Sequence, residues 1–202
     1  MTTNLNAPCP QYLCPLCQSP LLKGTFTAPS WPQTTLSESA LLQQQESAAR
    51  SLRCEKNHSF DIAKEGYINL LPVQHKHSKD PGDNKTMVNA RRAFLEKGYY
   101  QPLASRITEL YQKHLMQGNS HKVLDAGCGE GFYTHQHKVE NNHIYGVDIA
   151  KNAVRIAAKK YKGCCFSVGT LSNLPFEDQY FNWIFSVYAP ILEEEFTRIL
   201  AD

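Results

Sequence analysis

The feature that most constrains the fold is a short apolar run that ends in an acidic residue and opens into closely spaced glycines. The run is Val123 to Asp125, and Gly127, Gly129 and Gly131 follow it. Glycines at a strand-to-helix turn let the backbone bend sharply and leave no Cβ between the main chain and a ligand. A nucleotide-like cofactor can therefore lie against this turn.

Apolar runs alternate with amphipathic stretches on either side of the glycine turn. Such alternation predicts an α/β fold, with a parallel sheet and helices on its faces. The expected strands are residues 122–126, 143–148, 164–168 and 180–188. The expected helices are residues 101–117, 132–139, 150–161 and 192–200. The 143–148 strand ends in a second acidic residue, Asp148.

The spacing of the glycines distinguishes two classes of nucleotide-binding fold. A dinucleotide-binding fold needs GxGxxG with an acidic residue about 20 residues further on. Here the third glycine, Gly131, comes one position early and Phe132 fills its expected place. A nicotinamide-dependent oxidoreductase is therefore disfavoured.

The same pattern resembles the class I S-adenosylmethionine-dependent methyltransferases, which have a Rossmann-like sheet. In that family the glycine loop approaches the methionine moiety, and the acidic residue matched here by Asp148 hydrogen-bonds the ribose hydroxyls. Residues 174–181 also resemble the family's approach to its fourth strand. The resemblance implies S-adenosyl-L-methionine as the cofactor, whereas Asp125 has the alternative role of orienting the loop.

Three cysteines and a histidine form two short pairs in the first third of the chain. Cys14 and Cys17 form a CxxC pair, and Cys54 and His58 a CxxxH pair, which together make a tetrahedral zinc set. Four protein ligands leave no open position, so the predicted zinc is structural. The alternative is unrelated surface cysteines and a solvated histidine.

The separation of the two pairs is long, and residues 24–49 are rich in Thr, Ser, Gln and Pro. We interpret this stretch as an inserted loop, because loop-closure cost rises only slowly with length. For residues 37–52 a short helix and disorder remain equal alternatives. The chain has seven cysteines and no secretion signal, which favours thiols or metal ligands over disulfides.

Residues 60–74, 80–83 and 90–95 resemble the bacterial 23S rRNA (guanine-N1)-methyltransferases. With the four metal ligands and residues 127–132, the resemblance covers most of the chain. It implies that the N-terminal part of the chain with the zinc ligands helps to recognise RNA. It also implies that Tyr100, Gly129 and Glu130 contact the cofactor. The expected cofactor-binding residues are Tyr100, Asp125, Gly127, Gly129, Glu130, Gly131 and Asp148. No catalytic base is assigned.

The partner implied by this resemblance is 23S rRNA. Guanine N1 lies on the Watson–Crick edge, so the expected target is an unpaired base, as in a hairpin loop. Residues 72–97 carry six Lys or Arg side chains against three acids, which favours phosphate contacts. An ordinary solvated linker is the alternative for this stretch, because charge runs usually face water. The net charge of +2 is too small to decide between them.

The predicted organisation has three parts. Residues 1–71 form a zinc-ribbon-like RNA-recognition domain, residues 72–120 a linker and leading helices, and residues 121–202 a cofactor-binding Rossmann-like domain. Relatives continue into further strands, so the resemblance implies a sheet that is incomplete at the C-terminus, with residues 180–188 as an exposed edge. A truncated, catalytically dead rRNA-binding remnant is therefore the alternative function.

The sequence says less about the cellular location and the oligomeric state. The sequence shows no signal peptide and no apolar run of the roughly 18 residues needed to span a membrane, so we expect a cytoplasmic protein without a membrane partner. A homodimer is a possible assembly.

Overall fold

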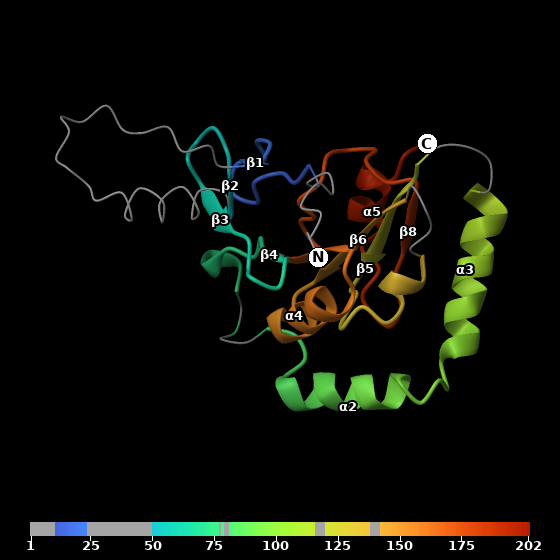
Figure 1. Ribbon diagram of the computed structural model, residues 1–202. Helices are drawn as coiled ribbons and strands as arrows, with labels where there is room; N and C mark the ends of the chain where they lie inside the picture. The colour runs from blue at the N-terminus through green and yellow to red at the C-terminus, as the bar shows by residue number, and fades with distance from the viewer. Residues whose placement is uncertain (1–10, 24–49, 77, 79–80, 116–119, 138–141) are drawn as a thin grey trace, which may run out of the picture.

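The computed structural model describes residues 11–23, 50–76, 78, 81–115, 120–137 and 142–202. They form a small antiparallel sheet beside a larger parallel sheet with helices around it (Figure 1). The small sheet has the order β1 (Leu22–Lys23), β2 (Ser51–Arg53) and β3 (Ser59–Asp61). The five-stranded parallel sheet has the order β4 (Ile68–Asn69), β7 (Cys165–Val168), β6 (His143–Asp148), β5 (Lys122–Ala126) and β8 (Trp183–Phe185).

The helices follow the expected positions with one exception. They are α2 (Lys85–Leu95), α3 (Gln101–Leu115), α4 (Lys151–Lys160) and α5 (Glu193–Ile199), with 3-10 turns η1 (Val73–His75) and η2 (Thr134–His137). The α-helix expected over residues 132–139 is wrong in type, because its described part is the single turn η2. Within the described residues, no helix is both long and apolar enough to cross a membrane.

Side-chain bonds to backbone carbonyls accompany the short η2. His135 Nδ1, Gln136 Nε2 and His137 Nδ1 each donate to the carbonyl four residues earlier, at 3.1 to 3.2 Å. Side chains that bond these carbonyls offer the backbone an alternative to the α-helical ladder. The helix expected over residues 37–52 is also wrong at its end, since Ser51 and Leu52 belong to β2. Residues 37–49 and 116–117 of the expected helices lie outside the described residues.

Strand β4 was not predicted, and it lies within the stretch assigned to the zinc-ribbon-like domain. Ile68 pairs with Ser167 and Asn69 with Val168, so β4 extends the parallel sheet beyond β7. The division at residue 71 stays a prediction. Strand β8 is shorter than the expected 180–188 segment and occupies the other edge of the sheet.

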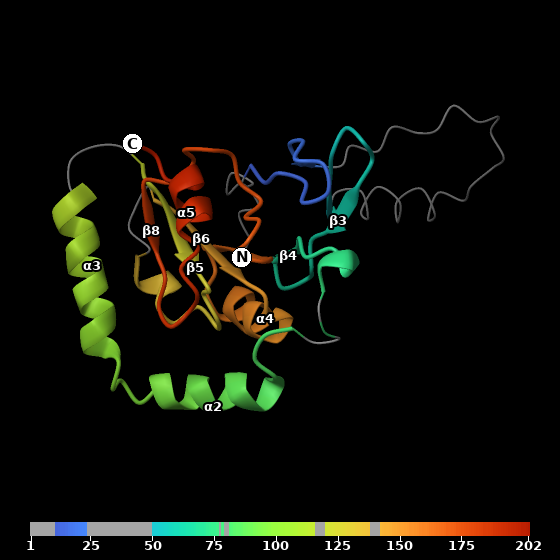
Figure 2. The same cartoon turned by 180° about the vertical axis from the view of Figure 1, so that it is seen from behind.

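Alternating side chains give the parallel sheet two apolar faces. Val123, Ile144 and Phe166 point to the face covered by α3 and α4, whereas Leu124 and Tyr145 point to the face that packs with α5. The two opposite views agree that α3 lies at the end of the molecule away from β1–β3 (Figures 1 and 2). Helix α2 is capped by Asn84, whose side chain accepts from Met87 N, and it buries Val88 against α4.

The antiparallel sheet and its cysteine turns, which we call the zinc module (residues 11–23 and 50–62), share a core with the parallel sheet. The Tyr12 ring lies 5.4 Å from the Phe176 ring, and Phe176 contacts Tyr145 and Phe181. Leu13 N also donates to Pro175 O at 2.8 Å. The zinc module is therefore part of the same packed body as the sheet.

We expect Phe176→Ala to lower the free energy of unfolding by about 3–5 kcal/mol, because Phe176 is fully buried and its loss leaves a cavity between the two modules. Chemical denaturation followed by tyrosine and tryptophan fluorescence measures the change. Leu22→Ala, at a strand position with 70% exposure, is the matched control and should change stability by less than about 0.5 kcal/mol. Equal effects of the two variants would contradict the shared core.

Candidate cofactor site and metal centre

Each glycine of the turn after β5 has a positive φ, but the three face different surroundings. A Cβ on Gly127 would lie 2.2 Å from Ala189 Cβ, and a Cβ on Gly131 would lie about 3.0 Å from Ala157 and Tyr161. Within the described residues, nothing lies within 4 Å of a Cβ placed on Gly129. Gly127 and Gly131 therefore permit close packing, and Gly129 leaves backbone open to a ligand.

A cavity of about 340 Å³ opens beside this turn. Its walls come from α2, the α2–α3 junction, the glycine turn, the end of β6 and the loop after β8. Five of the expected cofactor-binding residues line it: Tyr100, Gly127, Gly129, Glu130 and Asp148. Gly131 and Asp125 do not line it. The assignment of these residues to a cofactor stays a prediction.

Asp125 has an internal partner instead. Its side chain is 1% exposed and accepts a hydrogen bond from Thr134 Oγ1 at 2.7 Å. Burial raises the pKa of Asp125 to about 7, although the Thr134 bond lowers it. This contact fits the alternative role of Asp125, which is to orient the loop between β5 and η2.

The carboxylate of Asp148 links the glycine turn to the start of α4. Its Oδ2 accepts from Gly129 N at 2.9 Å and its Oδ1 from Ala150 N at 2.7 Å. Burial raises the pKa of Asp148, while these two backbone bonds lower it. Burial also raises the pKa of Glu130. Acidic groups thus surround the turn, which suits a ligand that carries positive charge.

Two polar atoms of residues that line the cavity are buried from solvent and have no partner within the described residues. They are Glu130 Oε1 and the hydroxyl of Tyr133. Unpaired polar atoms are costly when buried, which favours a ligand whose polar groups pair with them. S-adenosylmethionine fits this wall, because its ammonium and sulfonium are cationic and its hydroxyls can donate to carboxylates.

Sequence reasoning missed the wall contributed by α2 and the loop before it. Asp83, Arg91 and Phe94 line the cavity, and Arg91 contacts Asp83 at 2.5 Å. These residues belong to the 80–83 and 90–95 segments, which carry the family resemblance, and the sequence favours phosphate contacts only for Arg91 among the three. Tyr188 was missed as well; it lines the cavity with its ring 5.9 Å from that of Tyr100.

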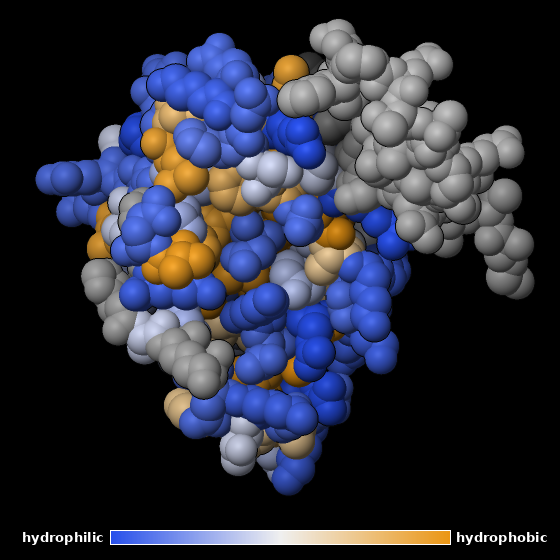
Figure 3. All heavy atoms as spheres, turned by 90° about the vertical axis from the view of Figure 1, so that its left-hand side faces the viewer, coloured by the Kyte–Doolittle hydropathy of each residue, from blue (hydrophilic) through white to orange (hydrophobic). Residues whose placement is uncertain are grey.

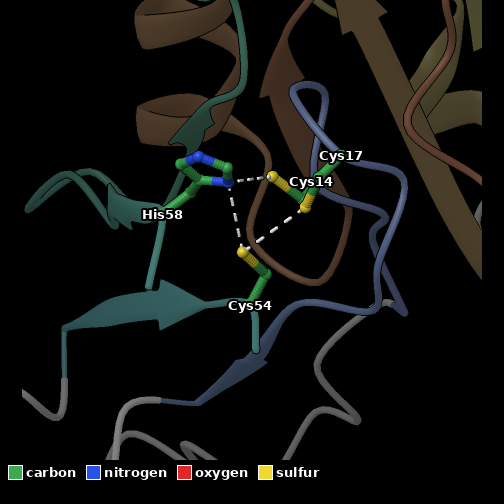
Figure 4. A group of neighbouring side chains, drawn as sticks. All are labelled: Cys14, Cys17, Cys54 and His58. Atoms are coloured by element: carbon green, nitrogen blue, oxygen red, sulfur yellow. Dashed lines mark hydrogen bonds between the residues drawn. The ribbon is translucent and has the colours of Figure 1, made fainter. Parts of the chain in front are cut away.

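The predicted metal ligands converge from two turns of the zinc module. Figure 4 shows the side chains of Cys14, Cys17, Cys54 and His58 pointing toward one another. Cys14 and Cys54 Sγ each lie 3.4 Å from His58 Nδ1, and the Sγ atoms of Cys17 and Cys54 are 3.6 Å apart. All four ligand atoms lie within 4.8 Å of one another.

Zinc coordination accounts for these separations. Tetrahedral geometry with usual bond lengths places two sulfurs about 3.8 Å apart, and a sulfur and a nitrogen about 3.6 Å apart. Both turns are tight enough to bring the two ligands of each pair together. Gln18 N donates to Cys14 O and Asn57 N to Cys54 O, and both Gln18 and Asn57 have positive φ. The four residues therefore fit a closed structural zinc site, which would hold the two turns together.

Two family models match separate parts of the chain. The zinc-ribbon model described as "RlmA, N-terminal" matches residues 36–79, which include Cys54 and His58. The model described as "Methyltransferase domain" matches residues 123–202. The chain therefore combines a zinc ribbon with a methyltransferase domain.

The chain is also similar to individual proteins over most of its length. The chain is 34% identical over 157 residues to the 23S rRNA (guanine(748)-N(1))-methyltransferase of Streptomyces fradiae, covering 76% of this chain and 55% of that protein. It is 30% identical to a putative 23S rRNA (guanine-N(1)-)-methyltransferase of Micromonospora griseorubida, covering 95% and 62% respectively. The chain thus spans somewhat more than half of the length of these relatives.

A solved structure supports the fold. A putative S-adenosyl-L-methionine-dependent methyltransferase from Methanococcus maripaludis matches with a TM-score of 0.51 and 20% identity, over 62% of this chain and 64% of that one. The fold class expected from the sequence, a class I methyltransferase sheet with an N-terminal zinc ribbon, is therefore confirmed.

We expect removal of zinc to destabilise both modules together, because Tyr12 and the ligand Cys14 belong to the same core as Phe176. The purified protein should contain one zinc ion per chain by atomic emission, and a chelator should lower Tm in a single transition. Cys17→Ser should lose the metal, whereas Cys164→Ser, outside the cluster, should keep it. Full metal content in Cys17→Ser would rule out this site.

We expect Asp125→Asn to change how stability depends on pH. The folded pKa of about 7 exceeds the ordinary value of 3.8, so the folded state keeps a proton that the unfolded state has released. The contribution of protonated Asp125 to the free energy of unfolding is therefore present at low pH and is lost as pH rises toward 7. Denaturation between pH 5 and 6.5 should show the free energy of unfolding of wild type falling relative to that of the variant by about 1.4 kcal/mol per pH unit. Parallel curves would show that Asp125 is ionised in the folded protein.

Proposed function

Because the chain is a relative of the 23S rRNA (guanine-N1)-methyltransferases, we propose that it transfers a methyl group from S-adenosylmethionine to N1 of a guanine in 23S rRNA. The observation that carries this proposal is the cavity where Gly129, Glu130 and Asp148 meet. Gly129 supplies backbone that is open to a ligand, and Glu130 supplies a buried carboxylate oxygen without a partner. Asp148 is the acid that ends β6.

The cavity residues have separate roles in this proposal. S-adenosylmethionine would supply an electrophilic methyl carbon: the S–CH₃ bond would break as the N1–CH₃ bond forms, leaving S-adenosylhomocysteine, and the N1 proton would pass to water. Asp148, which is held in place by Gly129 N and Ala150 N, would accept from the ribose hydroxyls. Glu130 would accept from a cationic or hydroxyl group of the cofactor through its unpartnered Oε1. Phe94 and Tyr100 form an apolar wall that excludes water. Alignment of donor and acceptor supplies most of the catalysis.

The acceptor in this proposal is an unpaired guanine, such as one in a hairpin loop, because a paired base hides its N1. The zinc module and the basic side chains of residues 72–97 would bind the surrounding RNA. Within the described part of that stretch, Arg91 is paired with Asp83 and Arg92 lies 4.0 Å from Glu96. The cations that remain to contact RNA phosphates are Lys76, Lys85 and Lys97. An rRNA substrate places the protein in the cytoplasm, and a homodimer stays a prediction.

We expect calorimetric titration of S-adenosylmethionine into the zinc-loaded protein to show one binding site. Asp148→Ala should abolish binding, because it removes the acceptor for the ribose and frees Gly129 N. Asp61→Ala, which removes an exposed carboxylate from β3, is the control and should bind as wild type. Equal binding by the two variants would place the cofactor elsewhere.

Methyl transfer to unmodified 23S rRNA then tests the reaction itself, with mass spectrometry of the digested RNA to identify the modified atom. Methylation at guanine N1 is the expected result, and methylation at another atom would correct the acceptor. RNA binding without methyl transfer would support the alternative of a non-catalytic RNA-binding protein.

A further inference from the structure

Helix α4 carries a one-sided charge that its own stability does not require. Its sequence, KNAVRIAAKK, contains four cations and no acid. The inward face buries Ala153, Val154 and Ala157, and the outer face exposes Lys151, Arg155 and Lys159. These three cations follow one another at intervals of four residues, so they form a stripe along one side of the helix.

The stripe is unfavourable for the helix taken alone. Like charges four residues apart repel each other, and Lys151 lies at the N-terminal end, where the helix dipole favours an acid. The N-cap, Ala150, makes no side-chain hydrogen bond. The repulsion along the stripe and the cation at the N-terminal end both destabilise the helix. The stripe is therefore better explained by binding of an external anion than by the stability of α4.

The acids around α4 leave the stripe without ion pairs. Lys160, off the stripe, bonds Glu96 at 2.8 Å, and Asp83 is paired with Arg91. Glu65 raises and Arg155 lowers the pKa of Tyr67, which burial raises most. Among the residues that the structure describes, Lys151, Arg155 and Lys159 form no ion pair.

The stripe begins beside the cofactor cavity. Lys151 and Lys76 line a second cavity of about 50 Å³, together with Asn69 and Asn152. This small cavity shares Asp83 and Ile149 with the wall of the larger one. Ammonium and amide groups are donors that suit a phosphate, and Asp83 is neutralised by Arg91.

At its other end the stripe approaches the segment that leads out of the zinc module. Lys162 Nζ donates to Glu65 O at 3.1 Å, and Tyr67 and Leu71 pack against α4. Figures 1 and 2 agree that α4 lies between β4 and α2. Seen from the side of the zinc module, the surface is mostly hydrophilic, with apolar side chains in separate small areas (Figure 3).

We propose that Lys76, Lys151, Arg155 and Lys159 form a track that binds the phosphate backbone of the RNA, from the edge of the cofactor cavity along α4 to residues 63–71. The inference rests on the proposed function, since it names the surface that holds the RNA around the methylated base. It differs from the contacts expected over residues 72–97, because three of its four cations lie on α4.

The test compares two matched double variants of the zinc-loaded protein. Arg155→Ala/Lys159→Ala removes one Arg and one Lys from α4, and Arg106→Ala/Lys113→Ala removes the same types from exposed positions on α3. Binding of unmodified 23S rRNA is measured by filter binding at several salt concentrations. The α4 variant should bind roughly tenfold more weakly near 0.15 M salt, with a salt slope smaller by about 1.4–1.8, whereas the α3 variant should match wild type.

Equal slopes for the two variants would overturn the track. Calorimetry with S-adenosylmethionine and methyl transfer to the same RNA are run in parallel, so that the two proposals fail separately. If wild type methylates the RNA but the α4 variant binds it normally, only the track is wrong. If wild type does not methylate the RNA but its binding depends on α4, the track stands and the proposed function fails. Unchanged calorimetry in the α4 variant shows that it is folded.

Discussion

The bonds from the Asp148 carboxylate to Gly129 N and Ala150 N are the interaction on which the rest of the site depends. They join the turn after β5 to the start of α4, so one side chain at the end of β6 fixes the glycine turn that lines the cavity. Gly127 N and Cys128 N add bonds to Val147 O of the same strand. The cavity is therefore shaped before any ligand enters, which lowers the ordering cost of binding.

The zinc module is built into this architecture rather than attached to it. Tyr12 reaches the Phe176 ring, and β4 continues the sheet beyond β7. Small modules of this size bury too little apolar surface to be stable alone, so metal ligands and a shared core supply what they lack. A metal site distant from the cofactor can thereby influence the stability of the sheet that carries the cofactor site.

Local patterns predicted much of this structure, and long-range packing accounts for what they missed. The glycine spacing and Asp148 indicated the cofactor turn, and the two short ligand pairs indicated the metal centre, because the glycines and each pair are local patterns of residue type and spacing. Strand β4 has only two residues, and its partner lies about 100 positions later, so no local pattern could reveal it. The α2 wall was missed for the same reason: Arg91 and Phe94 gain their role from where α2 packs. In η2, side-chain bonds to backbone carbonyls override an apparently helical pattern.

The pairing of β4 with β7 also sets an order for folding during synthesis. All four metal ligands have been translated once His58 is made, but the parallel partner of β4 is absent until Cys165 to Val168 follow. At roughly 5–20 residues per second, the ribosome needs several seconds or more to cover that interval. During this time the nascent zinc module can bind metal, but Tyr12 lacks its partner Phe176 and the β4 strand lacks β7. Translation speed and early metal loading therefore affect how much of the chain reaches the native state instead of aggregating.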